Sequence, residues 1–483
     1  MIDSNINYMR KGEMRMSKKI MLITAMITFI ALATTLIILI NIHHKKKDSG
    51  SFNTLTETDN EIGKSITISD VYTSEALSGL AYTYWVSPQV ISCGDNIFVG
   101  TVDRDGYSGV ATINKKDSAK NKNVEIEQTD ADNHDSTAIM TDPTDDRLLC
   151  FIFEHDKRNY INVYKSTKEQ SADEFEYISN IEFPKNVTYA QAFYYDSRYY
   201  VFTRVGTTSW YWAESYDLVE WNVHKLLLTM DPTGEKRPVQ YYIKFVTTSQ
   251  ENMLRMVMYS NPQSCDLAIR QGFFDLDTRI VYDGDGKTVV FPFEDKDAPY
   301  QTQFQILIDY PEYKDGEEYR QRVLDVASGL PLEDTRILYA YGQNVDIDAK
   351  EADIEYRMYQ NGDIQFLEYG GSYLWNKMSV PNGGVIANNG DIVYISSRNI
   401  EEQTDDIYRF DYIDGAYQET TEPVWSYHAN QDEFEDADLY DRYRLGFLTR
   451  DLDSKVLVWL EGYFNGQNYT DWNPSVNAAE IKK

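Results

Sequence analysis

The chain has 483 residues, a length that fits two or three average domains or one large all-β domain. Its 38 Tyr, 20 Phe and 8 Trp amount to 14% of the residues, which favours many short strands over a helical bundle. The formal net charge is −31; because residues 1–47 carry +6, the rest carries −31 − 6 = −37, which argues against nucleic acid as a direct partner.

An apolar segment near the start of the chain predicts a membrane anchor. Residues 20–42, IMLITAMITFIALATTLIILINI, contain no charge and can cross roughly 30 Å of hydrocarbon as a helix. A cleaved signal peptide is the alternative, but its apolar core would span only roughly 7–15 residues. Five Lys/Arg precede the segment and three follow it, which favours a cytoplasmic N-terminus at 1–19. We expect a single-pass protein of the cell membrane, a signal anchor in the lipid bilayer, and an extracytoplasmic C-terminal domain.

The rest of the chain divides into a polar stalk at 43–79, a propeller at 80–475 and a tail at 476–483. The stalk is rich in Ser, Thr, Asp and Glu and lacks apolar periodicity. In the propeller, apolar runs alternate with Asp/Asn/Gly turns. The predicted strand pairs lie at 89–114, 136–153, 187–205, 241–259, 354–369 and 385–397, with a closing strand within 454–464.

These units recur roughly every 40–60 residues, and none of them can bury both of its faces alone. This pattern predicts an all-β fold, a β-propeller with about seven blades, preceded by the single transmembrane helix. A pair of β-sandwiches is the alternative, but no linker divides the region. Residues 311–328 have a helix-friendly composition, and we interpret them as an insertion between blades.

Cysteine and metal chemistry have little scope in this sequence. Cys93, Cys150 and Cys265 lie far apart and include no C-x-x-C pair, so neither a zinc ribbon nor a dense disulfide framework is expected. We interpret them as small buried apolar residues, with one disulfide as the alternative. The sequence shows no clear ligand cluster and leaves any cofactor or metal undefined.

Two histidines bracket one predicted hairpin. His134 precedes the strand STAIM and His155 follows the strand LLCFIF. The two ends of a hairpin lie together, so both imidazoles can face one mouth of the central channel, where they would neutralise a carboxylate or bind a metal. The alternative is a pair of ordinary surface histidines at the hairpin ends.

The next predicted hairpin and the strand after it add three candidates. Tyr189 and Arg204 lie at the two ends of 187–205, and Tyr242 begins the following strand pair. A guanidinium presents a planar fork that suits a sugar carboxylate. A surface arginine paired with an acidic neighbour is the alternative interpretation of Arg204.

A short turn after this hairpin has a structural explanation. Ser215, Asp217 and Trp221 form an abbreviated Asp-box-like sequence, SYDLVEW. In such a turn the Asp accepts turn hydrogen bonds while the Trp packs inward. We therefore assign these residues no catalytic role.

In their order, these elements resemble the bacterial-neuraminidase-repeat propeller proteins related to the ulvan lyases. The resemblance covers about residues 85–290 and rests on NHD at 133–135, His155, TYAQ at 188–191, Arg204, the box at 215–221, RP at 237–238 and YIK at 242–244. The sequence departs from the family at Asp135, at Ala190, and at Val239 and Gln240. Asp135 adds a carboxylate beside His134, which works against the binding of a uronate.

The resemblance implies β-elimination at a 4-linked uronate of a polysaccharide. His134, His155 and Arg204 would neutralise the C6 carboxylate and so acidify the C5 proton. Tyr189 or Tyr242 would remove that proton and protonate the leaving oxygen. The sequence does not choose between the two tyrosines.

Other functions remain open at this point. The alternative to a lyase is a non-catalytic protein that binds glycans or assembles exopolysaccharide at the cell surface, with aromatic side chains stacking on sugars. A sialidase-type hydrolase needs an arginine triad with a Tyr/Glu pair, which the spacing does not supply. A protein-binding scaffold is the remaining interpretation.

Overall fold

In the computed structural model the described residues are 72, 77–83, 85–207, 209–228, 241–260, 268–286, 288–290, 303–309, 319–343, 354–368, 383–399, 404–420, 423–427, 443–463 and 473–482. The predicted cytoplasmic segment 1–19 and the anchor at 20–42 lie outside these ranges, as do Arg237, Pro238, Cys265 and His428. Within these ranges, no helix is both long and apolar enough to cross a membrane.

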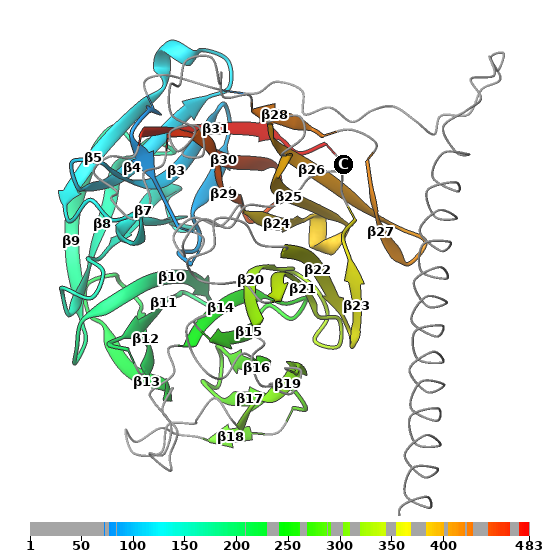
Figure 1. The fold of residues 1–483 in the computed structure, drawn as a ribbon. Coiled ribbons are helices and arrows are strands. Elements are labelled where there is room, and N and C mark those ends of the chain that lie inside the picture. Colours follow the sequence, from blue (N-terminus) through cyan, green and yellow to red (C-terminus); the bar gives the residue numbers. More distant parts are fainter. Residues whose placement is uncertain are drawn as a thin grey trace, which may run out of the picture. The chain divides into compact units, whose positions relative to one another are not determined.

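The described strands form seven antiparallel sheets, which are the blades of a β-propeller (Figure 1). The first four blades contain β1(Leu80–Ala81), β2(Val90–Cys93), β3(Asn96–Asp103), β4(Tyr107–Asn114) and β5(Lys122–Gln128); β6(Ala138–Thr141), β7(Arg147–Ile152), β8(Tyr160–Glu169) and β9(Phe175–Glu182); β10(Val187–Tyr195), β11(Arg198–Val205), β12(Ser209–Ser215) and β13(Asn222–Leu228); and β14(Tyr241–Thr247), β15(Met253–Ser260), β16(Ile269–Asp275), β17(Val281–Asp283), β18(Thr288–Val290) and β19(Gln305–Ile308).

The last three blades complete the ring. They contain β20(Tyr319–Val326), β21(Arg336–Gln343), β22(Ile354–Gln360) and β23(Asp363–Phe366); β24(Gly384–Ala387), β25(Ile392–Asn399), β26(Thr404–Ile413), β27(Ala416–Glu419) and β28(Trp425–Tyr427); and β29(Tyr443–Arg450), β30(Val456–Tyr463) and β31(Asn473–Glu480). The predicted all-β, seven-bladed propeller is therefore confirmed for the described part of the chain.

Turn chemistry explains several of the hairpins. Two-residue turns join β10 to β11 at Asp196-Ser197, β22 to β23 at Asn361-Gly362, and β26 to β27 at Asp414-Gly415, and both residues of each turn have positive φ. This left-handed backbone matches the twist of paired strands, and Asn, Asp and Gly adopt it most readily. The Asp/Asn/Gly turns predicted from the sequence thus do set the ends of these strands.

The hydrophobic core lies between the blades. Six clusters of buried side chains connect neighbouring blades around the ring. In ring order they join blades 1 and 2, blades 2 and 3, blades 3 to 5, blades 5 and 6, blades 6 and 7, and blades 7 and 1. Each blade therefore buries its two faces against two neighbours, which only a closed ring allows.

The two ends of the propeller meet in the last blade, and here two predicted boundaries are wrong. Tyr72 pairs with Ala478 and Ser78 with Ser475, so the N-terminal segment adds to the edge of β31. The predicted stalk at 43–79 thus includes part of the propeller. The predicted tail at 476–483 includes most of β31, because alternation in such a short strand gave no apolar run long enough to recognise.

The predicted insertion at 311–328 is also wrong over its described part. Residues 319–326 form β20, which is the first strand of the fifth blade and pairs with β21. Strand propensity depends on packing more than on composition, and Val323 and Val326 are fully buried here.

A segment of the first blade leaves the sheet and crosses toward other blades; we call residues 82–83 and 85–89 the crossing segment. The Thr83 N–H donates to a serine hydroxyl of the second blade. Ser87 bonds the third blade, donating to the Ala190 carbonyl at 3.2 Å and accepting from the Ala192 N–H at 2.7 Å. The crossing segment therefore links three blades across the middle of the ring.

Deleting residues 476–483 tests the closure of the ring. Val476 and Ala478 are fully buried, so the deletion should lower the free energy of unfolding by roughly 3 kcal/mol or more, as loss of buried core side chains does. Denaturant unfolding measures this. Deleting only 482–483 is the matched control and should have little effect; equal stability of the two deletions would contradict the closure.

Candidate functional site

The second, third and fourth blades bring all five predicted site residues into one cluster. His134 lies in the 3-10 turn η3(Asn133–Asp135), and His155 follows β7. Tyr189 is on β10, Arg204 on β11 and Tyr242 on β14. The structure therefore brings together two imidazoles, two phenols and a guanidinium, as the next paragraphs describe.

The two histidine rings stack on each other and share one carboxylate. Their centroids are 4.4 Å apart and their planes differ by 22°. The Nδ1 atom of His134 lies 2.5 Å from one oxygen of Asp132, and the Nδ1 atom of His155 lies 3.0 Å from the other. Asp132 also caps η3 by accepting the backbone N–H of His134. One carboxylate thus orients both rings.

The histidines and Asp132 set each other's protonation. Burial alone would raise the pKa of Asp132, but the charge of His134 and the hydrogen bonds from both histidines outweigh it and hold that pKa well below its usual range. Burial lowers the pKa of His134, and Asp132 only partly offsets this. His134 therefore gives up its proton more readily than an ordinary imidazole, and its Nδ1 faces the Asp132 carboxylate.

Asp135 does not place a negative charge beside His134, as its position next to His134 in the sequence had led us to expect. Its side chain is fully buried and accepts the backbone N–H of His155 at 2.6 Å and of Asp130 at 3.2 Å. Burial, aided by the nearby carboxylate of Asp132 and opposed by the hydrogen bond from the His155 N–H, raises the pKa of Asp135 to about 8. At neutral pH it is largely uncharged, so it fixes the loop and adds little negative charge beside His134.

Tyr189 is presented by an irregularity in its strand. The pairing of β10 with β11 shifts between Thr188 and Gln191, and Tyr189 has a positive φ of 66°. Such a conformation is costly for an aromatic residue and is commonly kept where a side chain must be aimed. Burial raises the pKa of Tyr189 well above its usual value, and Tyr242 adds to this effect. Tyr189 is therefore protonated.

Arg204 lies over both tyrosines without an acidic partner. Its guanidinium carbon is 4.9 Å from the ring centroid of Tyr189 and 5.7 Å from that of Tyr242. The residue is 3% exposed and its Nε has no hydrogen-bond partner. Among the described residues no carboxylate pairs with it, although a buried charge is costly unless it is paired.

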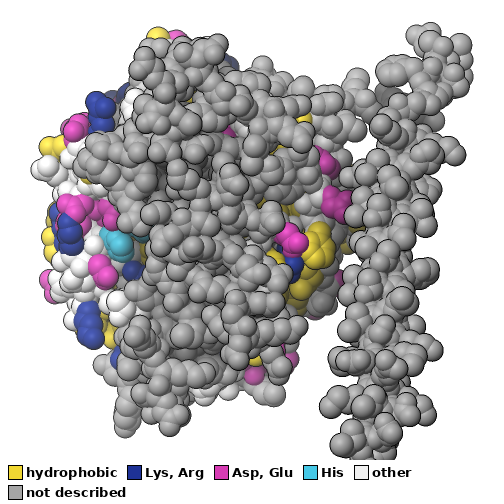
Figure 2. Space-filling view, in the orientation of Figure 1, with side chains coloured by type: hydrophobic (Ala, Val, Ile, Leu, Met, Phe, Trp, Pro, Cys, Tyr) yellow, Lys and Arg dark blue, Asp and Glu magenta, His cyan; other side chains and the backbone are white. Residues whose placement is uncertain are grey.

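The charges that surround the site are paired by contrast. Arg158 contacts Glu127 and Glu154, and Lys157 contacts Asp130. Figure 2 shows histidine at the surface beside such acidic and basic side chains. In an acidic chain with carboxylates this close, an arginine left unpaired indicates a place kept for an external anion.

Trp85 of the crossing segment packs into the same cluster. Its ring stacks on Tyr242 at 5.0 Å and on His134 at 5.5 Å, and lies 5.1 Å from Tyr189. Its Nε1–H donates to the Tyr259 hydroxyl at 2.8 Å. The indole therefore forms a wall shared by the histidine pair and the tyrosine pair.

Sequence reasoning missed four residues of this cluster: Asp132, Trp85, Tyr259 and Arg322, whose guanidinium lies 4.9 Å over Trp85. Asp132 carried a signal, because it precedes His134 by two residues at a capping position. The other three carried none, since only the path of the crossing segment brings Trp85 to the fourth and fifth blades.

Three residues of this cluster are also a candidate set of metal ligands. Potential ligand atoms of Asp132, His134 and His155 all lie within 4.8 Å of one another. Both Nδ1 atoms approach the carboxylate of Asp132, so the arrangement in this structure is that of a shared carboxylate.

The comparisons with known proteins support the fold. No protein-family model matches the sequence, and no curated protein matches it. Two solved structures of a PL25 ulvan lyase, a polysaccharide lyase, are similar to this chain, one of them bound to -[GlcA(1-4)Rha3S]-. Each has a TM-score of 0.56 and 11% sequence identity, and the match covers 85% of this chain and 94% of the lyase. The chain therefore has a polysaccharide-lyase-like propeller fold.

The raised pKa of Asp135 predicts a pH-dependent stability. Because the folded pKa of about 8 exceeds the unfolded value near 4, the stabilisation is complete below about pH 4 and is lost as the pH rises through 8. Asp135→Asn keeps an acceptor oxygen and cannot ionise. Between pH 5 and 9 the wild-type free energy of unfolding should fall relative to this variant by on the order of a few kcal/mol. A constant difference in denaturant unfolding would contradict the assignment.

Proposed function

We propose that this propeller binds an acidic polysaccharide and cleaves it beside a uronate by β-elimination. The observation that carries the proposal is Arg204, a buried guanidinium that has no carboxylate partner among the described residues and lies next to a histidine pair and a tyrosine pair. A sugar carboxylate supplies the charge that Arg204 lacks and accepts from its planar fork. The fold likeness to a lyase solved with a uronate-containing glycan supports the same substrate class.

Charge neutralisation is the main requirement of the reaction. Removing the C5 proton beside a C6 carboxylate builds up negative charge that a side-chain base cannot overcome alone. Arg204 neutralises the carboxylate, with a fixed charge that does not depend on pH in the physiological range. His155 completes the binding of the carboxylate from the other side of the histidine pair.

Proton transfer is divided between the two pairs. The lowered pKa of His134 keeps its neutral form available, so it takes the C5 proton, while Asp132 stabilises the imidazolium that forms. Tyr189 is protonated and interacts with Tyr242, and this pair gives a proton to the departing O4. The C4–O4 bond breaks as the C4=C5 double bond forms, so one proton is taken up and one released. This assignment differs from a single tyrosine serving both steps.

A second candidate function is glycan binding without cleavage. Trp85 contacts His134, Tyr189 and Tyr242, and such an aromatic wall suits sugar stacking as well as catalysis. Under this function, Tyr189→Phe and Tyr242→Phe would retain full glycan binding and neither they nor the wild type would release a product. Under the lyase function the wild type releases a product, and one of the two variants loses it.

We also propose that the protein acts at the cell surface. The support is the uncharged segment 20–42, which precedes a strongly acidic domain. A polysaccharide substrate is accessible to an exported propeller held in this way.

Arg204→Gln should abolish most turnover. The substitution removes the charge that neutralises the C6 carboxylate, so kcat/KM should fall about 100-fold or more, while Arg204→Lys should lose less. The measurement is the ultraviolet absorbance of the unsaturated product formed from uronate-containing glycans.

Arg147→Gln is the matched control for this experiment. Arg147 pairs with Asp145 and Glu176 at the surface of the second blade and should leave turnover unchanged. Wild-type activity in a folded Arg204→Gln variant would contradict the proposed role of the guanidinium.

A further inference from the structure

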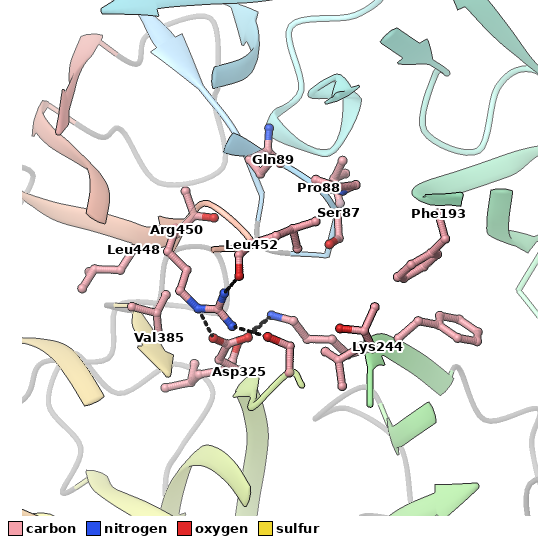
Figure 3. Close-up of a pocket in the computed structure, with 17 residues that line it drawn as sticks. Ser87, Pro88, Gln89, Phe193, Lys244, Asp325, Val385, Leu448, Arg450 and Leu452 are labelled. Atoms are coloured by element: carbon pink, nitrogen blue, oxygen red, sulfur yellow. Dashed lines mark hydrogen bonds and ion pairs between the residues drawn. The ribbon is translucent and has the colours of Figure 1, made fainter. Parts of the chain in front are cut away.

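A small cavity lies in the central channel next to the histidine site, and its wall combines apolar side chains with three charged ones. It measures about 60 Å³ and is lined by residues from the crossing segment and from β10, β14, β20, β24 and β29 (Figure 3). Tyr242 of β14 belongs to the histidine cluster, whereas Lys244 and Thr247 of the same strand line the cavity. The cavity and the proposed lyase site thus share a strand and the crossing segment, but they have no lining residue in common.

Three charged residues line this cavity: Lys244, Asp325 and Arg450. They come from the fourth, fifth and seventh blades. Figure 3 shows the Lys244 and Arg450 side chains reaching toward each other from opposite sides, with Asp325 between them. Two cations thus face one carboxylate, and the cavity wall carries a net charge of about +1.

Both carboxylate oxygens of Asp325 are occupied by contacts with neighbouring groups. One of its oxygens lies 2.8 Å from the Lys244 Nζ, and the other accepts the Ile386 N–H at 2.8 Å and lies 3.7 Å from the Arg450 Nε. Burial alone would raise the pKa of Asp325, but Lys244 and Arg450 together lower it, so it stays ionised. It has no capacity to neutralise a second cation.

Lys244 and Arg450 each have N–H donors beyond those used in their contacts with described residues. The Lys244 Nζ carries three hydrogens and, among the described residues, contacts Asp325 and the Leu324 carbonyl at 3.2 Å. The Arg450 Nε and Nη1 donate to backbone carbonyls, whereas within the described part of the chain Nη2 has one contact, at 3.5 Å with the Ser328 hydroxyl. An ammonium and a guanidinium with unused donors border the same space.

We propose that this cavity is a binding site for a small oxyanion. The net positive charge and the spare donors of Lys244 and Arg450 favour an anion, because charge-assisted hydrogen bonds are the strong ones. The hydroxyls of Ser87, Ser328 and Thr449 offer further contacts. The ligand class is a carboxylate of acetate size or an inorganic oxyanion such as phosphate.

The volume of the cavity suits a small ligand. A single water needs roughly 10–15 Å³ of such volume, so about 60 Å³ holds a handful of atoms. An oxyanion bound there would hold three blades and the crossing segment together from inside the channel.

The test is thermal unfolding of the full-length chain in acetate or phosphate, at an ionic strength kept constant with gluconate, which is too large for the cavity. A site-bound ligand raises Tm with saturation. Acetate and phosphate are separate titrations, and the stronger response identifies the form of oxyanion. A Tm that rises with neither anion overturns the proposal.

Two substitutions should shift the response in opposite directions. Lys244→Gln reduces the local charge to zero and should raise the anion concentration at half-saturation by about tenfold or more. Asp325→Asn raises the local charge to +2 and should lower that concentration by about tenfold. Lys116→Gln, at an exposed pair with Asp95, is the matched control and should behave like the wild type.

The direction in which each variant shifts the half-saturating anion concentration distinguishes binding at this site from a general salt effect. Stabilisation by excluded salts does not saturate and would be the same in every variant. An unchanged response in Lys244→Gln, or a weaker one in Asp325→Asn, contradicts the proposal. If Lys244→Gln fails to fold, the wild-type and Asp325→Asn titrations still decide.

Discussion

Ring closure is the constraint on which the rest of this structure depends. Each blade has two apolar faces, and the clusters between successive blades bury both only when the last blade meets the first. The pairing of Tyr72 and Ser78 with β31 completes that meeting. Closure turns the first strands of all blades toward one axis, so side chains distant in sequence converge there.

The crossing segment lies between the histidine site and the channel cavity, and it contributes residues to both. Trp85 faces the histidine site, whereas Ser87 and the residues up to Gln89 line the channel cavity. The two regions differ in chemistry: aromatic rings dominate the first, and an ion triad lines the second. One stretch of chain thus gives the propeller a broad aromatic site and a small polar cavity. Its contacts with the second and third blades fix both at once.

Electrostatics within the histidine site follow from burial and from one carboxylate. Asp132 contacts the Nδ1 atoms of both imidazoles and so orients the two rings together. Asp135, one residue after His134, is buried and largely uncharged, so the departure from the family pattern there costs the site little negative charge. Arg204 is the cation of this cluster that has no carboxylate partner among the described residues. This division of charge leaves a positive group within an acidic protein.

The sequence alone determined the fold class, because apolar runs and Asp/Asn/Gly turns are local signals that each hairpin carries independently. It also supplied His134, His155, Tyr189, Arg204 and Tyr242, since ends of hairpins are predictable from the same signals. Only the tertiary structure decided that these ends share one cluster, that Trp85 and Arg322 join it, and that Asp132 rather than Asp135 governs the histidines. Residues 476–480 and 319–326 were misassigned for the same reason: their strands are defined by partners distant in the chain, and pairing across a closed ring leaves no mark on local composition.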